Sequence, residues 1–259
     1  MRKTNYFLNL FVVLFMGVGS INAQVANIPY TCDFEDATEN AIWGTNSLTA
    51  NQWVIGTATY SSATTSVYIS NTGGTTANYT NAGTVAPLYR EFYTTAGEQY
   101  QISFDWKANG FSSTSATSGA DLRVYWVDDP NVDVATWIAT NNTEPAAAVP
   151  FRKAILQGKT YWGKYTFVVT GNGSNARLVF LWRNGTSATY SAAAYQPGGC
   201  IDDIDIILCP PATIPYSHTF EDIIENAKWV TNSSTVNKWV MDSAESKSPI
   251  NSAYISNDG

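Results

Sequence analysis

Alternation of apolar and polar residues is the main structural signal in this chain. Tyr100, Ile102, Phe104 and Trp106 share one parity, and the residues between them are polar. Such a pattern predicts a strand with one buried face. Further strands are predicted at 122–127, 165–169, 176–182 and 201–208. Turns rich in glycine and asparagine separate them, and no stretch of useful length has helical periodicity. The pattern predicts an all-β fold, an antiparallel β-sandwich.

The first 23 residues have the pattern of a targeting segment. Arg2 and Lys3 precede an apolar stretch at 7–18, and Ala23 supplies a small residue before Gln24. This order predicts a secretory signal peptide at residues 1–23. About a dozen apolar residues are too few to span ~30 Å of hydrocarbon, and no later stretch is longer, so we expect no membrane span. The expected location is extracellular, either secreted or at the cell surface.

The chain contains an internal repeat with an offset of 186 residues (214 minus 28). Residues 28–36, Ile-Pro-Tyr-Thr-Cys-Asp-Phe-Glu-Asp, match residues 214–222, Ile-Pro-Tyr-Ser-His-Thr-Phe-Glu-Asp, and the register continues without a gap. So long a period indicates tandem domains rather than a solenoid. We predict one complete domain at 28–209, a proline-rich linker at 210–213 and the start of a second, incomplete copy at 214–259. The chain is then expected to be part of a larger multidomain protein.

Composition and charge narrow the classes of function. The chain has 14 Lys and Arg against 21 Asp and Glu, and it lacks a basic run, which argues against nucleic-acid binding. An aromatic content of 14% argues against intrinsic disorder. One histidine and three cysteines leave little material for a zinc site or a histidine-based triad. We therefore expect a protein that is not an enzyme.

Several motifs, taken in order, resemble the MAM family. Residues 32–36, Cys-Asp-Phe-Glu-Asp, resemble its opening, and residues 100–106 and 122–126 resemble two of its strands. Residues 201–204, Ile-Asp-Asp-Ile, resemble the closing strand shared with bacterial cleaved-adhesin and choice-of-anchor J domains. The resemblance covers most of 28–209 and implies a jelly roll, extracellular adhesion or ligand binding without catalysis, and often a structural calcium ion. A second cysteine shortly after the first, present in vertebrate MAM domains, is missing, so the bacterial branch is the closer relative.

Acidic pairs on the first and last predicted strands form a candidate metal site. These residues are Glu35, Asp36, Asp202 and Asp203, and the terminal strands of a jelly roll can lie side by side. Calcium takes six to eight oxygen ligands, so we predict that the four acids and loop carbonyls bind it. One alternative is that the acids only solvate strand ends. Another is a glycosidase pair, which needs two carboxyls ~5–10 Å apart across an open cleft, and nothing in the sequence marks such a cleft.

Long loops carry the candidate ligand-binding aromatics. Trp137 lies in the loop at 128–150, and Tyr190 and Tyr195 lie in the loop at 184–199. Exposed loop aromatics stack on sugars or anchor a protein partner, so we predict an extracellular protein or carbohydrate ligand. Alternatively, Trp137 closes one end of the sandwich. The favoured function is a non-catalytic adhesion or ligand-binding module. The second candidate is an accessory domain of a secreted hydrolase or peptidase whose catalytic domain lies outside this chain.

The three cysteines suit an oxidising compartment. Cys200 and Cys209 lie at opposite ends of one predicted strand, ~30 Å apart at ~3.3 Å per residue, so they cannot pair with each other. Cys32 could pair with either one, and the sequence leaves that choice open.

Overall fold

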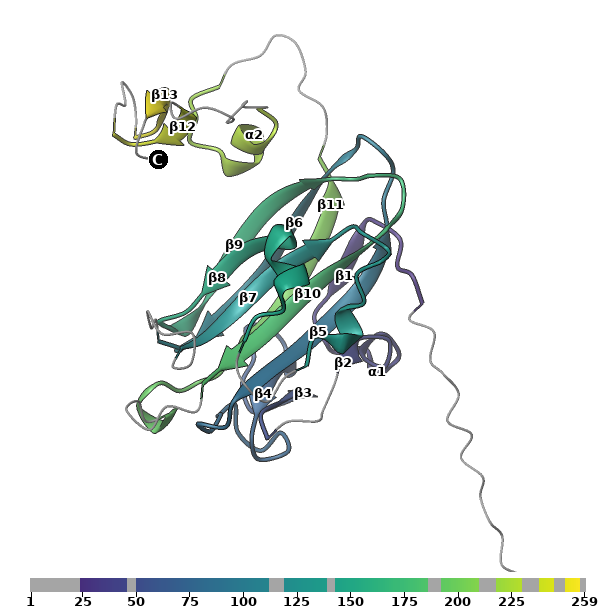
Figure 1. Ribbon diagram of the computed structural model, residues 1–259, viewed down its shortest axis with the longest axis vertical. Helices are drawn as coiled ribbons and strands as arrows, with labels where there is room; N and C mark the ends of the chain where they lie inside the picture. Colours follow the sequence, from purple (N-terminus) through teal and green to yellow (C-terminus); the bar gives the residue numbers. More distant parts are fainter. Residues whose placement is uncertain are drawn as a thin grey trace, which may run out of the picture.

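Two antiparallel sheets pack face to face (Figure 1). The computed structural model describes residues 24–45, 50–111, 119–138, 143–185, 192–209, 218–229, 238–244 and 250–256. The six-stranded sheet has the order β3-β4-β11-β6-β9, with β1 also paired to β11. Its strands are β1 (Tyr30–Cys32), β3 (Gln52–Gly56), β4 (Ser66–Ser70), β6 (Gln99–Ala108), β9 (Lys159–Thr170) and β11 (Cys200–Leu208). The five-stranded sheet consists of β2 (Gly44–Thr45), β5 (Thr84–Tyr93), β10 (Asn175–Asn184), β7 (Ala120–Val127) and β8 (Arg152–Leu156), in that order.

The strand order is that of a jelly roll. Strands β4, β11, β6 and β9 lie in one sheet, and β5, β10, β7 and β8 lie in the other. This interleaving of early and late strands is the double Greek key of an eight-stranded jelly roll. The prediction of an all-β antiparallel jelly-roll sandwich is therefore confirmed. The five strands read from the alternation correspond to β6, β7, β9, β10 and β11.

Aromatic side chains fill the space between the sheets. Trp106, Trp126 and Trp182, which the strand pattern places in the core, are all buried. The Phe180 ring meets Phe104 edge to face at 4.9 Å between ring centroids. Such pairs contribute about 0.5–1.5 kcal/mol beyond their burial. The core therefore occupies the interior of the sandwich, which leaves its outer faces and its ends for function.

The connection between β7 and β8 covers the outer face of the five-stranded sheet. We term residues 128–151 the cover segment; it contains the short 3-10 helices η1 (Val134–Thr136) and η2 (Ala146–Phe151). Figure 1 shows both helices lying in front of this sheet. Val134, Trp137 and Ala148 of the cover segment pack on outward-facing Val179 and Leu181 of β10. Both faces of the five-stranded sheet are thus buried where β10 and β7 lie.

Buried charges fasten the cover segment to the sheet. Asp121 forms ion pairs with Arg123, at 2.6 Å, and with Arg183, and all three residues are buried. Arg123 also pairs with Glu144 of the cover segment, and the Tyr125 hydroxyl donates to the same carboxylate at 2.6 Å. Because buried charges are costly unless paired, this network fixes how the cover segment sits.

The described residues beyond 218 repeat the local geometry of the N-terminal segment. Helix α1 (Ala37–Asn40) is capped by Asp36, and α2 (Ile223–Ala227) is capped by Asp222. Phe34 and Phe220, two residues before these caps, both have left-handed backbones, with φ of 59° and 64°. The equivalence therefore extends from the sequence to backbone conformation.

The hairpins that follow these helices also correspond. In β3–β4, Gln52 pairs with Ser70, and in β12 (Lys238–Asp242) and β13 (Ser252–Ser256), Lys238 pairs with Ser256. Each partner in the second hairpin lies 186 residues after its counterpart. The predicted signal peptide and linker lie outside the described residues. None of the helices in the described part of the chain is long and apolar enough to cross a membrane.

All three cysteines are buried free thiols. The register of β1 on β11 places Cys32 opposite Ile204. Cys200 and Cys209 are therefore four and five residues along the strand from that point, more than ~10 Å away at ~3.3 Å per residue. A disulfide requires Cα atoms within about 7 Å, so neither of the pairings left open by the sequence is formed.

Candidate functional site

A polar pocket of about 620 Å³ lies between two connections at one end of the sandwich. Small-molecule sites have volumes of about 300–1,000 Å³. Part of its wall follows β4, and the rest precedes β11, around the short helix η3 (Ala192–Ala194). We term it the amide pocket because carboxamides are the most frequent side chains among its described lining residues, which are Asn71, Thr72, Thr76, Asn78, Tyr79, Thr80, Asn81, Ala192, Ala193 and Gln196. None of these residues carries a charge.

A tight turn starts the first wall. Gly73 and Gly74 have φ of 66° and 97°, a left-handed conformation that glycine adopts without steric cost. The Ser70 hydroxyl accepts hydrogen bonds from the backbone N–H groups of Thr72, at 3.1 Å, and Gly74, at 3.0 Å. The turn sends the chain back along the pocket, where the Asn71 N–H donates to the Asn78 carbonyl at 2.9 Å.

Side-chain amides join the two walls. Gln196 accepts from the Tyr79 N–H at 3.1 Å and donates to the Tyr79 carbonyl at 2.9 Å and the Ala192 carbonyl at 2.8 Å. Asn81 Oδ1 accepts from the Ala192 N–H at 2.9 Å. Gln196 thus bonds to Tyr79 as a neighbouring strand would, and the two walls form one unit.

Two fully buried asparagines hold the pocket from beneath. Asn51 accepts from the Thr80 N–H at 2.8 Å and donates to the Thr80 carbonyl at 3.0 Å, and Asn184 of β10 donates to the same carbonyl at 3.0 Å. Trp182 Nε1 donates to Asn184 Oδ1 at 3.0 Å, which fixes that amide in turn. The wall at 79–84 is therefore held in place before any ligand arrives, which reduces the entropy cost of binding.

Three lining side chains take no part in this scaffold. Among the described residues, Asn71 Oδ1 and Tyr79 Oη are buried and have no hydrogen-bond partner. The side-chain amide of Asn78, an exposed residue, likewise makes no hydrogen bond within that part of the chain. Burial raises the pKa of the Tyr79 hydroxyl, so it stays protonated and is a potential donor. The pocket thus has a bonded frame and a separate set of free polar groups.

Neither Trp137 nor Tyr195 is among the described residues that line this pocket. Trp137 is only 3% exposed, and its ring packs against Tyr125 at 5.3 Å between ring centroids. The expectation of an exposed tryptophan is wrong, because its large apolar surface covers the five-stranded sheet. Tyr195 is half-buried against Phe111, at 4.9 Å, although its own loop supplies Gln196. Tyr190 lies outside the described residues.

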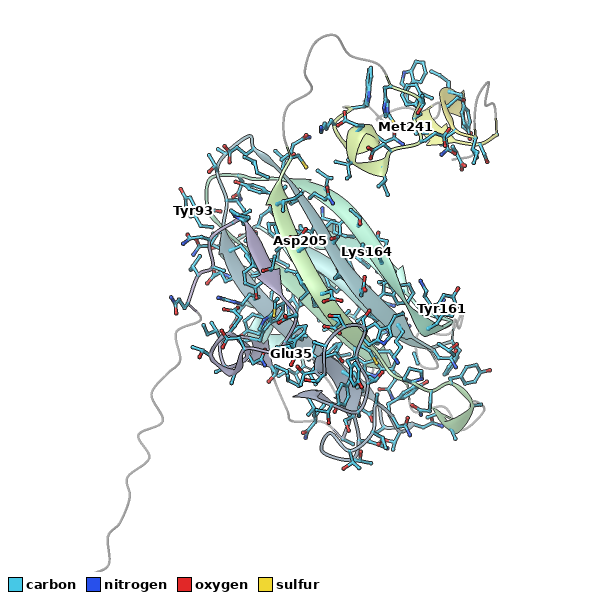
Figure 2. All side chains as sticks on the ribbon, turned by 180° about the vertical axis from the view of Figure 1, so that it is seen from behind. Glu35, Tyr93, Tyr161, Lys164, Asp205 and Met241 are labelled. Atoms are coloured by element: carbon cyan, nitrogen blue, oxygen red, sulfur yellow. The ribbon has the colours of Figure 1, made fainter. Side chains whose placement is uncertain are left out.

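Three of the four acids predicted to bind calcium contact one loop, residues 59–65, which we term the acid-held loop. Glu35, labelled in Figure 2, accepts from the Thr64 N–H at 2.8 Å and the Thr65 N–H at 2.6 Å. Asp202 Oδ2 accepts from the Ser61 N–H at 2.7 Å. Asp203 Oδ1 accepts from the Ser62 hydroxyl at 2.6 Å. The last strand and the segment after β1 do therefore bring Glu35, Asp202 and Asp203 to the same loop, although Asp202 is buried.

The environments of these acids differ. Hydrogen bonds from Thr65 and Thr64 lower the pKa of exposed Glu35 to about 2. Burial raises the pKa of Asp202 to about 6, although the N–H groups of Ser61 and Ser62 oppose that shift. Glu35 is thus ionised across the neutral range, whereas Asp202 is the acid that an adjacent cation would affect most.

The fit of calcium to these acids is incomplete. Carboxylate and carbonyl oxygens are its usual protein ligands. Within the described residues, however, no three Asp, Glu, His or Cys side chains converge closely enough to hold an ion. Glu35 and Asp202 accept N–H groups that an ion would have to displace, and Asp36 instead caps α1, accepting from the Thr38 N–H at 2.7 Å. Calcium binding therefore stays a prediction.

Melting the protein in chelator, calcium and magnesium tests that prediction. If calcium binds only the folded state, a hundredfold excess over Kd stabilises it by ~2.7 kcal/mol, a rise of several degrees in Tm. Magnesium should do much less, because it demands a tight octahedron. Asp203→Asn should reduce the calcium response, whereas Asp36→Asn, away from the loop, should preserve it. Equal midpoints in all three solutions would mean that the acids hold the loop without an ion.

No family model and no curated protein matches this chain. Among solved structures, it is similar to the CBM22-1 xylan-binding domain of Paenibacillus barcinonensis Xyn10C, with 15% identity over 73% of this chain and 100% of that one, at a TM-score of 0.39. It is also similar to a family 35 carbohydrate binding module from Clostridium thermocellum, with 12% identity over 69% and 96%, at a TM-score of 0.33. A third such structure is TmCBM61 in complex with β-1,4-galactotriose, with 11% identity over 64% and 88%, at a TM-score of 0.35. At these identities the likeness concerns the β-sandwich fold alone.

Proposed function

We propose that this chain is a secreted, non-catalytic carbohydrate-binding module that takes its ligand in the amide pocket. The main observation behind it is that some side chains hold the pocket walls by hydrogen bonds, while other amides in the lining take no part in that scaffold. Gln196, Asn51 and Asn184 hold the walls, and Asn71 and Asn78 remain available. A carboxamide both donates and accepts hydrogen bonds, as does a sugar hydroxyl, so the free groups match the repeating chemistry of a saccharide.

The contents of the pocket favour binding over catalysis. Its lining residues include no carboxylate, histidine, cysteine or lysine, which are the groups that most often transfer protons or form covalent intermediates. The acids elsewhere, at the acid-held loop, accept hydrogen bonds from backbone and hydroxyl groups. Recognition by positioned amides is the chemistry that the pocket can supply.

The domain organisation in this proposal follows the repeat. Residues 28–209 form the binding domain, 210–213 a linker and 214–259 the beginning of a second copy, after a signal peptide at 1–23. The matching caps, left-handed phenylalanines and hairpin registers at an offset of 186 support this division. We propose that the module belongs to a larger extracellular protein of the cleaved-adhesin type, in which repeated modules add avidity.

Removing one free amide tests the proposed site. On an array of plant, microbial and animal oligosaccharides we expect binding by the intact protein. Titration calorimetry with the strongest array ligand should then show binding by Asn78→Ala about 2- to 10-fold weaker, the effect of one hydrogen bond. Thr160→Ala, an exposed change on β9, is the matched control and should bind normally. Absence of binding to the array, or equal affinity for both variants, would refute the proposed site.

A further inference from the structure

We infer that the amide pocket selects uncharged saccharides, excludes those with carboxylate or sulfate groups, and reads hydroxyls by hydrogen bonding rather than by stacking. This inference rests on the proposed function and specifies its ligand class. Three properties of the described lining residues support it. They carry no charge, their one aromatic ring packs on the core, and they include a buried acceptor oxygen without a hydrogen-bond partner.

The first property is the lack of charge. All ten lining residues are neutral, and the chain as a whole has a net charge of −7. An anionic group that leaves water needs a countercharge or charge-assisted hydrogen bonds. No cationic side chain is among the described lining residues to supply one, and the overall charge repels anions at longer range. A neutral sugar loses no ionic hydration on entering.

The second property concerns stacking. Among the described residues that line the pocket, Tyr79 is the one aromatic, and it is 3% exposed. Its ring packs edge to face on the core residue Trp182, with centroids 5.0 Å apart and an interplanar angle of 66°. The ring is therefore committed to the core and has no free face for a sugar. Within the described lining, the groups that can recognise a ligand are therefore the amides and hydroxyls.

The third property is an unpaired buried acceptor. Asn71 Oδ1 is buried and has no partner among the described residues. Asn71 is a half-buried residue of the pocket lining, so a change of its side-chain rotamer would bring this oxygen within reach of a sugar hydroxyl, which can donate to it. An ionised carboxylate or sulfate has only acceptor oxygens and would be repelled. The exposed Asn78 amide, on the same wall, supplies a donor and a second acceptor. The arrangement therefore discriminates by hydrogen-bond direction as well as by charge.

Matched pairs of trisaccharides test the inference. Galactose and glucose trisaccharides are each compared with the corresponding galacturonate and glucuronate trisaccharides by calorimetry at low salt. We expect neutral members to bind at least tenfold more tightly. Asn78→Lys should reduce this ratio by adding a countercharge, whereas Thr160→Lys, which adds the same charge on β9, should leave it unchanged.

The outcomes separate the two proposals. If uronates bind as tightly as their neutral partners and Asn78→Ala weakens that binding, the inferred selectivity for neutral sugars is wrong. The proposed carbohydrate site would still stand. A ratio that falls equally in both lysine variants would show that overall charge, rather than the pocket, sets the preference, and would also overturn the inference. Failure of every neutral and acidic saccharide on the array to bind would instead overturn the proposed function.

Discussion

Asp121→Ala should lower the melting midpoint by roughly 10 °C. The substitution leaves the guanidinium groups of Arg123 and Arg183 buried without their shared carboxylate. Breaking a buried ion pair by removing one partner costs about 3–5 kcal/mol, and each kcal/mol shifts Tm by about 2–4 °C in a domain of this size. Thermal denaturation followed by circular dichroism measures the shift.

Two further variants test whether the loss of stability comes from the buried, unpaired arginines. Asp129→Ala removes a half-buried acid of the neighbouring cover segment, whose side chain accepts from Asn131, and should change Tm much less. Replacing Asp121, Arg123 and Arg183 together by leucine and two methionines should recover much of the loss, because apolar residues of similar volume need no countercharge. A midpoint for Asp121→Ala within a degree or two of the wild type would show that water reaches these charges and screens them.

Trp137→Ala should destabilise the domain by about 3–5 kcal/mol, the usual cost of removing a buried tryptophan side chain. Its ring packs on Tyr125 and closes the apolar cluster between the cover segment and β10. The loss should expose the outer face of the five-stranded sheet, so binding of a hydrophobic dye should increase below the melting transition. Denaturant unfolding gives the stability change directly.

The same variant separates a structural role from a binding role. At a temperature where it remains folded, Trp137→Ala should bind the array ligand with unchanged affinity, because Trp137 does not line the amide pocket. Tyr161→Ala is the control, since that side chain is 70% exposed and its removal should leave stability nearly intact. Loss of binding without loss of stability would restore Trp137 as a ligand-contacting residue.

The strand pattern predicts the sandwich well where one face is polar, as in β6, and less well elsewhere. Residues 178–182 of β10 read Leu-Val-Phe-Leu-Trp and are apolar on both parities. Such a run indicates a strand covered on both faces, and it already implies that something must cover Val179 and Leu181. The second apolar parity of β10 therefore indicates a covering segment, and Trp137 is buried because it belongs to that segment.

Strand β5 was missed for a different reason. Pro87 interrupts its pattern, and proline is confined to edges, strand starts and bulges. Among the described residues, β2 pairs with β5 only at Leu88 and Tyr89, so Pro87 has a strand partner on one side alone, Leu181 of β10. A partner strand of only two residues, such as β2, cannot be predicted from the local sequence.

The candidate site was predictable only in part. Residues 71–81 are rich in asparagine and threonine and uncharged, which is a signal for polar recognition, but this composition is also common in ordinary loops. That this segment meets Gln196 depends on contacts more than a hundred residues apart in sequence. The acids were easier to place, because pairing of β1 with β11 follows from the resemblance to jelly-roll domains, although their bonds to the acid-held loop do not.

The two buried asparagines beneath the pocket have an evolutionary consequence. Asn51 and Asn184 lie outside the lining, and they hold the wall mainly through the backbone N–H and carbonyl of Thr80, to which the Thr80 hydroxyl adds one longer bond to Asn51, at 3.3 Å. The residues that would touch a ligand can therefore change without altering the path of the main chain. A library randomised at Asn71, Thr76 and Asn78 should consist mostly of folded proteins with different preferences, so repeated copies of this module can diverge in specificity while sharing one framework.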